Sequence, residues 1–348
     1  LFCFVFCIFF TNFSVSLTFN DIRKRQNVDG NIDNIIELVQ RADPIMDQIK
    51  WIQGNLPTGN RTTQRTSLPR GEIRRINRGV GNSKSTTRQI TDTCAMIEGH
   101  SQIDKKLLKL QNDPMAYRMS EDRAMVMGMT QQVCDMLFYG NADKNPDEFN
   151  GIATRIASYG GKIGDSSYQV INGGGTTVKK QTSAYLVCFG DQAVTGIYPK
   201  NSAAGFSRTD KGEIMVSDPD GKQYEALLTI YGWEPGLAVH DPRMLAAVRN
   251  IDTATLALES ATAEQKKAIV DKMIIAQHRI RHFMNVNAAW YVSPFMMTLL
   301  NLYYNDKANV YITRKEAMDG MPEYYVNGIR VLEEQAITDE EAVIKEAK

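Results

Sequence analysis

The residue types that could do chemistry first come together in one short stretch, RGVGNSKST, from Arg78 to Thr86. Two glycines, a lysine and several hydroxyl side chains are the ingredients of a loop that holds a nucleotide phosphate. Such a loop needs a glycine directly before the lysine, so that backbone N–H groups can close on the anion. Ser83 stands at that place, and Arg78 stands where the first glycine belongs. The flanking segments also lack the required strand and helix, so this stretch needs another explanation.

Four histidines limit the acid–base and metal chemistry that the chain could carry: His100, His240, His278 and His282. The last two are four residues apart and would share a helix face, but two arginines between them would oppose a bound cation. His240 precedes Asp241 and a proline, a pattern that favours a helix N-cap. No nucleophile elbow, dinucleotide fingerprint or calcium loop is present. We therefore expect no enzymatic activity, no catalytic residue, no metal and no cofactor.

The cysteines point to a reducing environment. Their positions form no C-x-x-C pair, and the three in the body of the chain are far apart: Cys3, Cys7, Cys94, Cys134 and Cys188. This spacing speaks against both a zinc site and a disulfide framework. A compartment that keeps thiols reduced is the simplest interpretation.

The first sixteen residues form an apolar leader, LFCFVFCIFF followed by TNFSVS. The run is too short to span a bilayer securely, and no basic segment precedes it. Our preferred interpretation is a misplaced start, in which upstream sequence has been translated ahead of a true start near Ser16. An export signal is the alternative.

The stretch between Thr62 and Ile103 predicts two long β-arms joined by a turn, because it is rich in Thr, Ile and Arg and is interrupted by glycines and a proline. From Thr58 to Thr87 its large apolar residues are few: Leu68, Ile73, Ile76 and Val80. A hairpin of this composition cannot bury itself in a core of its own. We place its turn at RGVGNSKST.

The remaining segments predict a mixed α+β fold without βαβ periodicity. Helical spacing appears from Asn31 to Ile49 with a break at Pro44, and a long helix begins at Asp113-Pro114 and ends at Gly140, its methionines interpreted as core packing. A glycine-rich connector leads to short strands beyond residue 180. Further helices are expected over 241–249, over 263–283 and after Ser293-Pro294, and Asn327-Gly328 predicts a tight hairpin.

Positive and negative charges balance over the whole chain, but they are unevenly distributed along the sequence. Lysines plus arginines equal aspartates plus glutamates at 40 each, which speaks against a dedicated nucleic-acid binder. The predicted hairpin nevertheless carries eight cations against one anion, Glu72, and the cations are Arg61, Arg65, Arg70, Arg74, Arg75, Arg78, Lys84 and Arg88. An exposed basic hairpin indicates an acidic neighbour, and we expect these eight residues to make contacts between subunits.

Several separate blocks, in this order, carry a resemblance to a known family. They are GNLPTGNRTTQRTSLP from Gly54, STTRQITDTCAMIEGHSQIDKKL from Ser85, MSEDRAMVMGMTQQVCDMLFYGN from Met119 with PDEFNGIATR, and YGWEPGLAVHDPRMLAAVRNID from Tyr231. The chain resembles the major capsid proteins of tailed bacteriophages, in the short-tailed-phage branch of the Hong Kong ninety-seven-type coat fold. The resemblance runs from about Leu17 to the late 330s.

The resemblance implies a domain organisation. After the leader (1–16), it implies an N-arm over 17–56, an extended E-loop hairpin over 57–104, a P-domain with a spine helix over 105–182 and an A-domain over 183–310. Residues 311–348 would return to the P-domain and end in an acidic tail. No room remains for an extra N-terminal scaffolding domain, which implies a separate scaffolding protein.

The implied function is self-assembly, as pentamers and hexamers, into an icosahedral head shell around packaged double-stranded DNA. The partners would be further copies of the chain, a scaffolding protein, a portal and DNA bound non-specifically, with no membrane. Assembly would take place in the host cytoplasm and the product would be the virion capsid. Two alternatives stay open: a nucleic-acid-binding module that uses the basic hairpin 61–88, and a secreted hydrolase suggested by the leader alone. Lys84 is the one lysine of the hairpin that could cross-link to a neighbouring asparagine, as in some coats of this fold.

Overall fold

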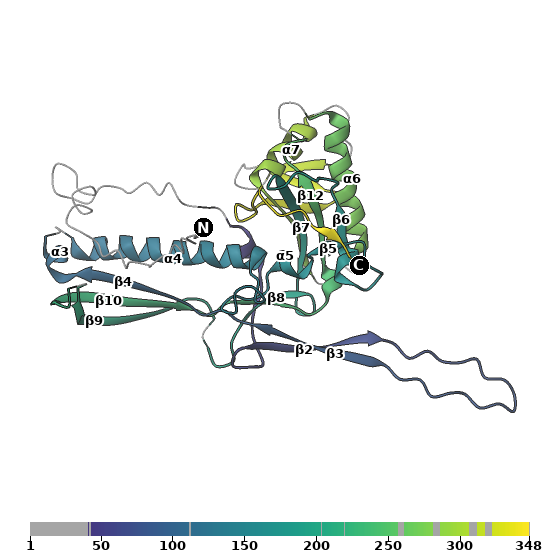
Figure 1. Cartoon of the computed structure of the whole chain (residues 1–348), viewed down its shortest axis with the longest axis horizontal. Coiled ribbons are helices and arrows are strands. Elements are labelled where there is room, and N and C mark those ends of the chain that lie inside the picture. Colours follow the sequence, from purple (N-terminus) through teal and green to yellow (C-terminus); the bar gives the residue numbers. More distant parts are fainter. Residues whose placement is uncertain are drawn as a thin grey trace, which may run out of the picture. The chain divides into compact units, whose positions relative to one another are not determined.

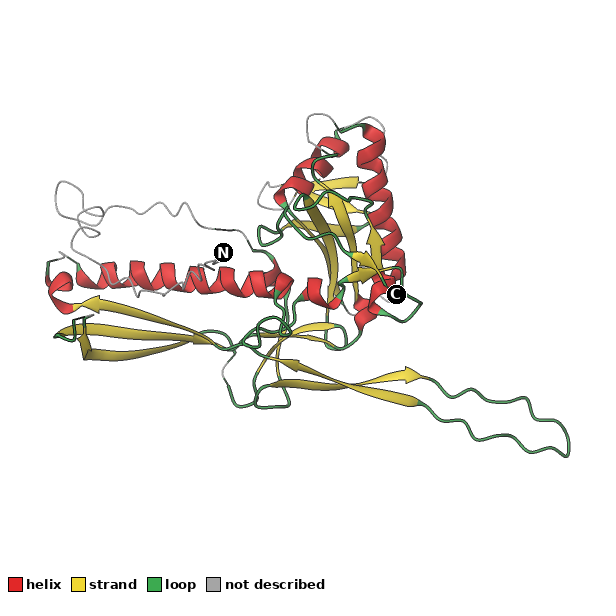
Figure 2. Ribbon diagram, in the orientation of Figure 1, coloured by secondary structure: helices red, strands yellow, loops and turns green. Residues whose placement is uncertain are grey.

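The computed structural model describes residues 41, 43–110, 113–202, 204–218, 220–256, 261–280, 286–305, 312–316 and 322–347 (Figures 1 and 2). The expected leader, the expected N-arm up to residue 40 and His282 lie outside these residues. Within them the chain forms two compact units, each assembled from segments that are distant in sequence.

The first unit contains residues 98–127 and 207–232. Its sheet has the strand order β4 (Ile97–Asp104), β10 (Gln223–Trp233) and β9 (Ser207–Ser217), joined by α3 (Lys105–Lys109) and the first half of α4 (Pro114–Tyr139). Helix α4 begins where the sequence predicts, because the Asp113 carboxylate accepts hydrogen bonds from the backbone N–H groups of Met115 (3.1 Å) and Ala116 (3.0 Å).

Burial in this unit is shallow. A small apolar cluster of Ile103, Leu108 and Tyr117 fixes α3 and α4 on the sheet. The interpretation of the helix methionines as core packing is correct only further along α4, where Met129 and Met136 are buried, since Met115 and Met119 are 67% and 64% exposed.

The second unit contains the other described segments and is built around a ten-stranded sheet. Its central strand β7 (Gln181–Phe189) lies between β12 (Leu245–Asp252) and β13 (Asn287–Val292), both antiparallel to it. Strand β6 (Val170–Asn172) extends the sheet beyond β12, and β16 (Ile329–Glu333), β15 (Pro322–Val326) and β14 (Ile312–Glu316) extend it beyond β13. At one end of β7, a single bridge leads to β8 (Val194–Tyr198), which pairs with β1 (Trp51–Gln53) and β11 (Gly236–Val239).

All nine residues of β7 are buried, because both faces of the sheet are covered. Helices α6 (Ala263–Arg279) and α7 (Pro294–Tyr304) cover one face in a single apolar cluster that contains Leu186, Trp290 and Leu299 (Figure 1). The end of α4 covers the other face, where the Phe138 ring lies 5.7 Å from that of Tyr185.

Shorter elements complete this unit: α2 (Ile45–Gln48), α5 (Ile152–Arg155), β5 (Ser158–Tyr159), the 3₁₀ turns η1 (Ser166–Gln169) and η2 (Pro242–Met244), and β17 (Lys345–Glu346). Two sequence predictions are confirmed in detail. The Ser293 hydroxyl caps α7 with Pro294 in its first turn, and Asn327 and Gly328 have φ angles of 46° and 84° in the turn between β15 and β16.

One predicted helix, over 241–249, is wrong. Only η2 is helical there, capped by Asp241 as expected, and the alanine-rich segment after it is strand β12. This segment lies between β6 and β7 with seven of its eight residues buried. Backbone pairing in the sheet interior therefore outweighs the helix preference of its alanines.

The sheets of the structure do not follow the domain ranges that the resemblance implies. Those ranges place residues 97–104 in the E-loop and residues 207–233 in the A-domain. Strand β4 pairs with β10 and is not part of the β2–β3 hairpin, and β9 and β10 belong to the first unit rather than to the β7 sheet. The ranges given for E-loop, P-domain and A-domain stay predictions.

Candidate functional site

The predicted hairpin consists of β2 (Gly59–Ser67) and β3 (Thr86–Thr93), which are antiparallel and in register from Gly59 opposite Thr93 to Ser67 opposite Thr86. Threonines dominate both strands, and their β-branched side chains favour an extended backbone. Because side chains alternate, Thr62, Gln64 and Arg88 lie on one face, and Arg61 and Arg65 lie on the opposite face.

The first face of the hairpin is fixed to the body of the second unit through His240. Its imidazole lies between two hydroxyl groups, with Nδ1 3.1 Å from Thr62 Oγ1 and Nε2 3.1 Å from Thr195 Oγ1. The Gln64 amide donates to the His240 carbonyl at 2.7 Å. Burial lowers the pKa of His240, against the opposing charges of Asp92 and Asp191, so the ring is held neutral. Nothing in the sequence pattern links Thr62 to His240, because the two are 178 residues apart.

A buried ion pair holds the other strand. The Arg155 guanidinium lies 2.8 Å from the Asp92 carboxylate, whose side chain is only 3% exposed. The same guanidinium donates to the carbonyl groups of Leu237 (2.8 Å) and Asn150 (3.1 Å). These contacts satisfy the charge on Arg155 and position the base of the hairpin on β11.

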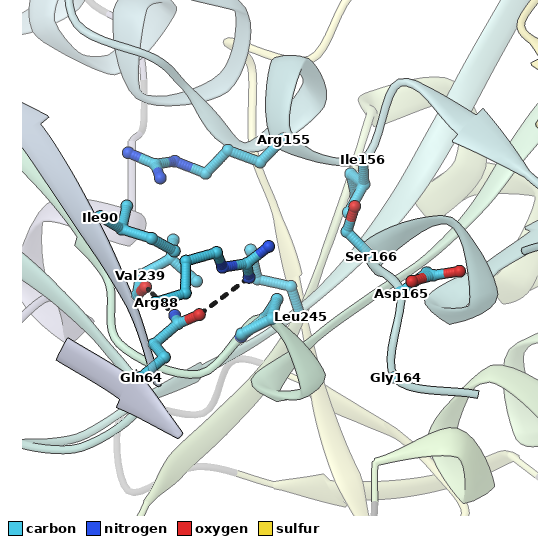
Figure 3. Close-up of a pocket in the computed structure, with 11 residues that line it drawn as sticks. Gln64, Arg88, Ile90, Arg155, Ile156, Gly164, Asp165, Ser166, Val239 and Leu245 are labelled. Carbon is cyan, nitrogen blue, oxygen red and sulfur yellow. Dashed lines mark hydrogen bonds between the residues drawn. The ribbon is translucent and has the colours of Figure 1, made fainter. Parts of the chain in front are cut away.

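A cavity of about 300 Å³ lies beside this anchor (Figure 3). In the close-up, Arg88 donates to the Gln64 side chain at 2.9 Å, and the Arg155 side chain extends past Ile90. Its other lining residues include Ile90, Asp165, Ser166 and Leu245. Histidine and cysteine are absent from this lining.

The chain between Ser67 and Thr86 continues as an unpaired loop (Figure 1). It reverses at Arg75–Arg78, where the Arg78 N–H donates to the Arg75 carbonyl at 3.2 Å and Asn77 has a φ of 62°. The prediction of a turn at RGVGNSKST is therefore wrong. The register of β2 with β3 places the midpoint near residue 76, and Gly79 and Gly81 lie in the returning arm without positive φ.

Large apolar side chains of this loop project into solvent. Ile73 is 98% exposed, Ile76 93% and Leu68 74%. Within the loop itself, the Glu72 carboxylate accepts a hydrogen bond from the Gly81 N–H at 3.1 Å. The turn therefore presents two isoleucines surrounded by arginines.

The eight predicted cations do not form a single patch. Arg61 and Arg65 lie on the outer face of β2, Arg88 faces the anchor, and the other five are in the loop: Arg70, Arg74, Arg75, Arg78 and Lys84. None of the eight forms an ion pair with any described residue. Their charges are consequently available to another molecule.

The described cysteines are not poised for reaction. Burial raises the pKa of Cys94 and of Cys188 to about 12 and also raises the pKa of Cys134, so all three remain thiols. Over the described ranges, no three side chains of His, Cys, Asp or Glu are grouped so that they could hold a metal ion. Nor is any helix in the described part of the chain both long and apolar enough to cross a membrane.

Comparison with solved structures identifies the fold. The chain is similar to a chain in the near-atomic-resolution structure of bacteriophage epsilon15, with 25% identity, a TM-score of 0.70, and coverage of 95% of this chain and 98% of that one. It is also similar to the capsid of bacteriophage JBD30, with 9% identity, a TM-score of 0.53, and coverage of 87% and 95% respectively. The second likeness supports the coat fold alone.

Comparison of sequences identifies the family. No curated protein matches the chain. The family model described as major capsid protein GP7, however, matches residues 27–345. This match covers most of the sequence, and it agrees with the coat fold and with the exposed basic hairpin. The chain therefore belongs to the major capsid protein GP7 family and is a coat protein that forms the head shell of a bacteriophage.

Proposed function

We propose that copies of this protein join into the shell by laying the loop of the β2–β3 hairpin on a neighbouring copy. The observation that carries the proposal is the exposure of Ile73 and Ile76 beside arginines that have no ion-pair partner within the described chain. Exposed isoleucines gain free energy when a partner covers them, and unpaired arginines favour a surface with carboxylates. The buried anchor at the base, with His240 and the Asp92–Arg155 pair, supports a hairpin that is positioned before assembly.

Charge reversal at the turn tests this proposal. R74E/R75E in the full chain should block or weaken shell formation, measured by sedimentation and negative-stain microscopy. The thermal midpoint of the unassembled protein should stay nearly unchanged, because exposed loop charges contribute little to folding. The adjacent pair Lys266 and Lys267 on α6 offers a matched control with the same change in charge. Normal shells from R74E/R75E would contradict the proposal, and so would a collapsed thermal midpoint.

The wider assembly is part of the same proposal. The shell would consist of pentamers and hexamers and would enclose double-stranded DNA without sequence preference. A separate scaffolding protein and a portal would take part. As the resemblance implies, residues 57–104 would form the E-loop, residues 105–182 with α4 the P-domain, and residues 183–310 the A-domain. The chain would act without catalysing a reaction.

The alternative is that the hairpin binds nucleic acid directly, and its unpaired cations at 61–88 are the observation that favours it. This function predicts that the unassembled protein binds free DNA with an affinity that falls steeply as salt rises. Titrating labelled duplex DNA at two salt concentrations distinguishes the two functions. Exposed isoleucines at the turn favour a protein surface instead, because a phosphate backbone offers them no apolar contact.

A further inference from the structure

We infer that the turn of the hairpin docks into one defined groove on a second copy of the chain, formed by the end of α4 and the segments 95–97 and 145–148. This inference rests on the proposed function and adds the receiving surface to it. The groove, called the acidic groove below, is a cavity of about 400 Å³ lined by Ala95, Met96, Ile97, Gln132, Asp135, Met136, Tyr139, Gly140, Asn145, Asp147 and Glu148.

The charge of the acidic groove is of one sign. Its lining contains three carboxylates and neither lysine nor arginine. Asp135 is already 2.9 Å from Arg41 but its side chain is still 55% exposed, and Glu148 accepts hydrogen bonds from Asn141 and Asn145. Asp147 is exposed and forms no ion pair within the described ranges. An arginine that approaches would gain an electrostatic partner without displacing one.

The acidic groove also offers apolar surface. Met96 is 84% exposed beside the mostly buried Met136. Methionine is flexible and polarisable, so it adapts its shape to an inserted side chain. Exposed Met96 can therefore make apolar contact with an isoleucine, while Asp147 can pair with an arginine.

The turn of the hairpin has the complementary composition. Ile73 and Ile76 are almost fully exposed, and Arg74 and Arg75 lie between them in sequence. Two other cavities suit the turn less well, because cations outnumber carboxylates in their linings. Arg88 and Arg155 accompany Asp165 beside the hairpin base, and Lys144, Arg249 and Lys345 accompany Glu148 beside the C-terminal segment.

The occupant must be a second copy. The loop extends away from the body of its own unit (Figure 1), while the base of the hairpin is fixed by the buried Asp92–Arg155 pair. A turn held in this way is presented to another molecule, and in a shell the available surface is that of an identical chain.

Photo-crosslinking in assembled particles tests the inference. A photoreactive amino acid at position 76 should join the turn to residues 95–97, 132–140 or 145–148 of another copy, identified by mass spectrometry of the cross-linked peptides. Crosslinks to a different segment of another copy would show that the turn does not dock in the acidic groove, and would leave the proposed function intact. Crosslinks within one chain only would overturn both. The same probe at the exposed Asp220 of the β9–β10 turn should not reach the acidic groove.

A charge swap gives a second, independent measurement. D147K should reduce the yield of particles roughly tenfold. The control D143K changes an exposed carboxylate of the same turn that does not line the groove, and should have little effect. Combining D147K with R75E should restore part of the yield. The inference is wrong if R75E impairs assembly while D147K alone does not, and if adding D147K to R75E restores none of the lost yield. The hairpin would then dock elsewhere.

Discussion

The Arg249 guanidinium lies 3.1 Å from the Glu341 carboxylate in the interior of the second unit, where both side chains are less than a tenth exposed. Glu341 also accepts hydrogen bonds from the hydroxyl groups of Tyr139 (2.7 Å), Tyr185 (2.9 Å) and Ser183 (2.5 Å). Arg249 completes its contacts at the carbonyl groups of Ala153 and Ile156. One carboxylate from the C-terminal segment thus joins the end of α4, the central strand β7 and α5.

Removing the charge on Arg249 should therefore destabilise the fold strongly. R249M leaves Glu341 buried without its cation, and we expect the free energy of unfolding to fall by about 3–5 kcal/mol. Urea denaturation of the unassembled protein measures this loss. The matched control is E340Q, which changes the exposed neighbouring carboxylate. An unfolding free energy for R249M close to that of the parent would show that the pair is not structurally important.

Because of Glu334, we expect the free energy of unfolding to fall as pH rises. Its side chain is fully buried, its Oε2 accepts from the Ile45 N–H at 3.1 Å, and the ionisable groups that interact with it include Asp43, Cys134 and Tyr291. Burial, with the hydrogen bond and charge of Asp43, raises the pKa of Glu334 to about 9. The folded protein therefore binds this proton more tightly than the unfolded chain does.

The stabilisation is complete below the usual glutamate pKa of about 4.5 and is lost as pH rises towards 9, by on the order of 1 kcal/mol for each pH unit. E334Q stays neutral and should remove this part of the pH dependence, as measured by urea denaturation between pH 5 and pH 8. E333Q, which changes the preceding and only partly buried glutamate at the end of β16, should keep it. Parallel pH profiles for the parent and E334Q would contradict the assignment.

Gly59 should be essential to the base of the hairpin. Its φ is 155°, and a Cβ at this position would overlap the carbonyl oxygen of Asp92 and contact Thr93. G59A should therefore lower the free energy of unfolding by about 2 kcal/mol and speed amide hydrogen exchange in β2 and β3. Gly71 in the loop is the control, because nothing lies within 4 Å of a Cβ there. Unchanged protection in G59A would show that the ladder tolerates the shift.

Asn77 sets the reversal of the loop, and its substitution should affect assembly more than folding. Asparagine tolerates the left-handed conformation that it adopts here at φ 62°, whereas a β-branched residue does not. N77V should reduce the yield of particles, N77G should preserve it, and both should leave the thermal midpoint of the unassembled protein close to that of the parent. Equal yields from N77V and N77G would show that the turn geometry is not needed for docking.

The sequence alone determined the features that depend on neighbouring residues. The start of α4 at Asp113-Pro114, the cap of α7 at Ser293 and the turn at Asn327-Gly328 are local, because each is made by side chains within a few positions of the backbone groups that they satisfy. The basic, core-poor hairpin was equally evident from composition, and the ordered sequence blocks were sufficient to identify the coat family.

Contacts between distant residues needed the tertiary structure. Strand β12 is a strand because β6 and β7 pair with it on both sides, and the hairpin turns near Asn77 because the register of β2 with β3 places its midpoint there. The contact of Thr62 with His240 joins residues 178 positions apart. The acidic groove joins segments 95–97, 132–140 and 145–148, which no spacing rule connects. Local propensity differs between conformations by about 1 kcal/mol per residue or less, so the burial of β7 and of the Arg249–Glu341 pair outweighs it.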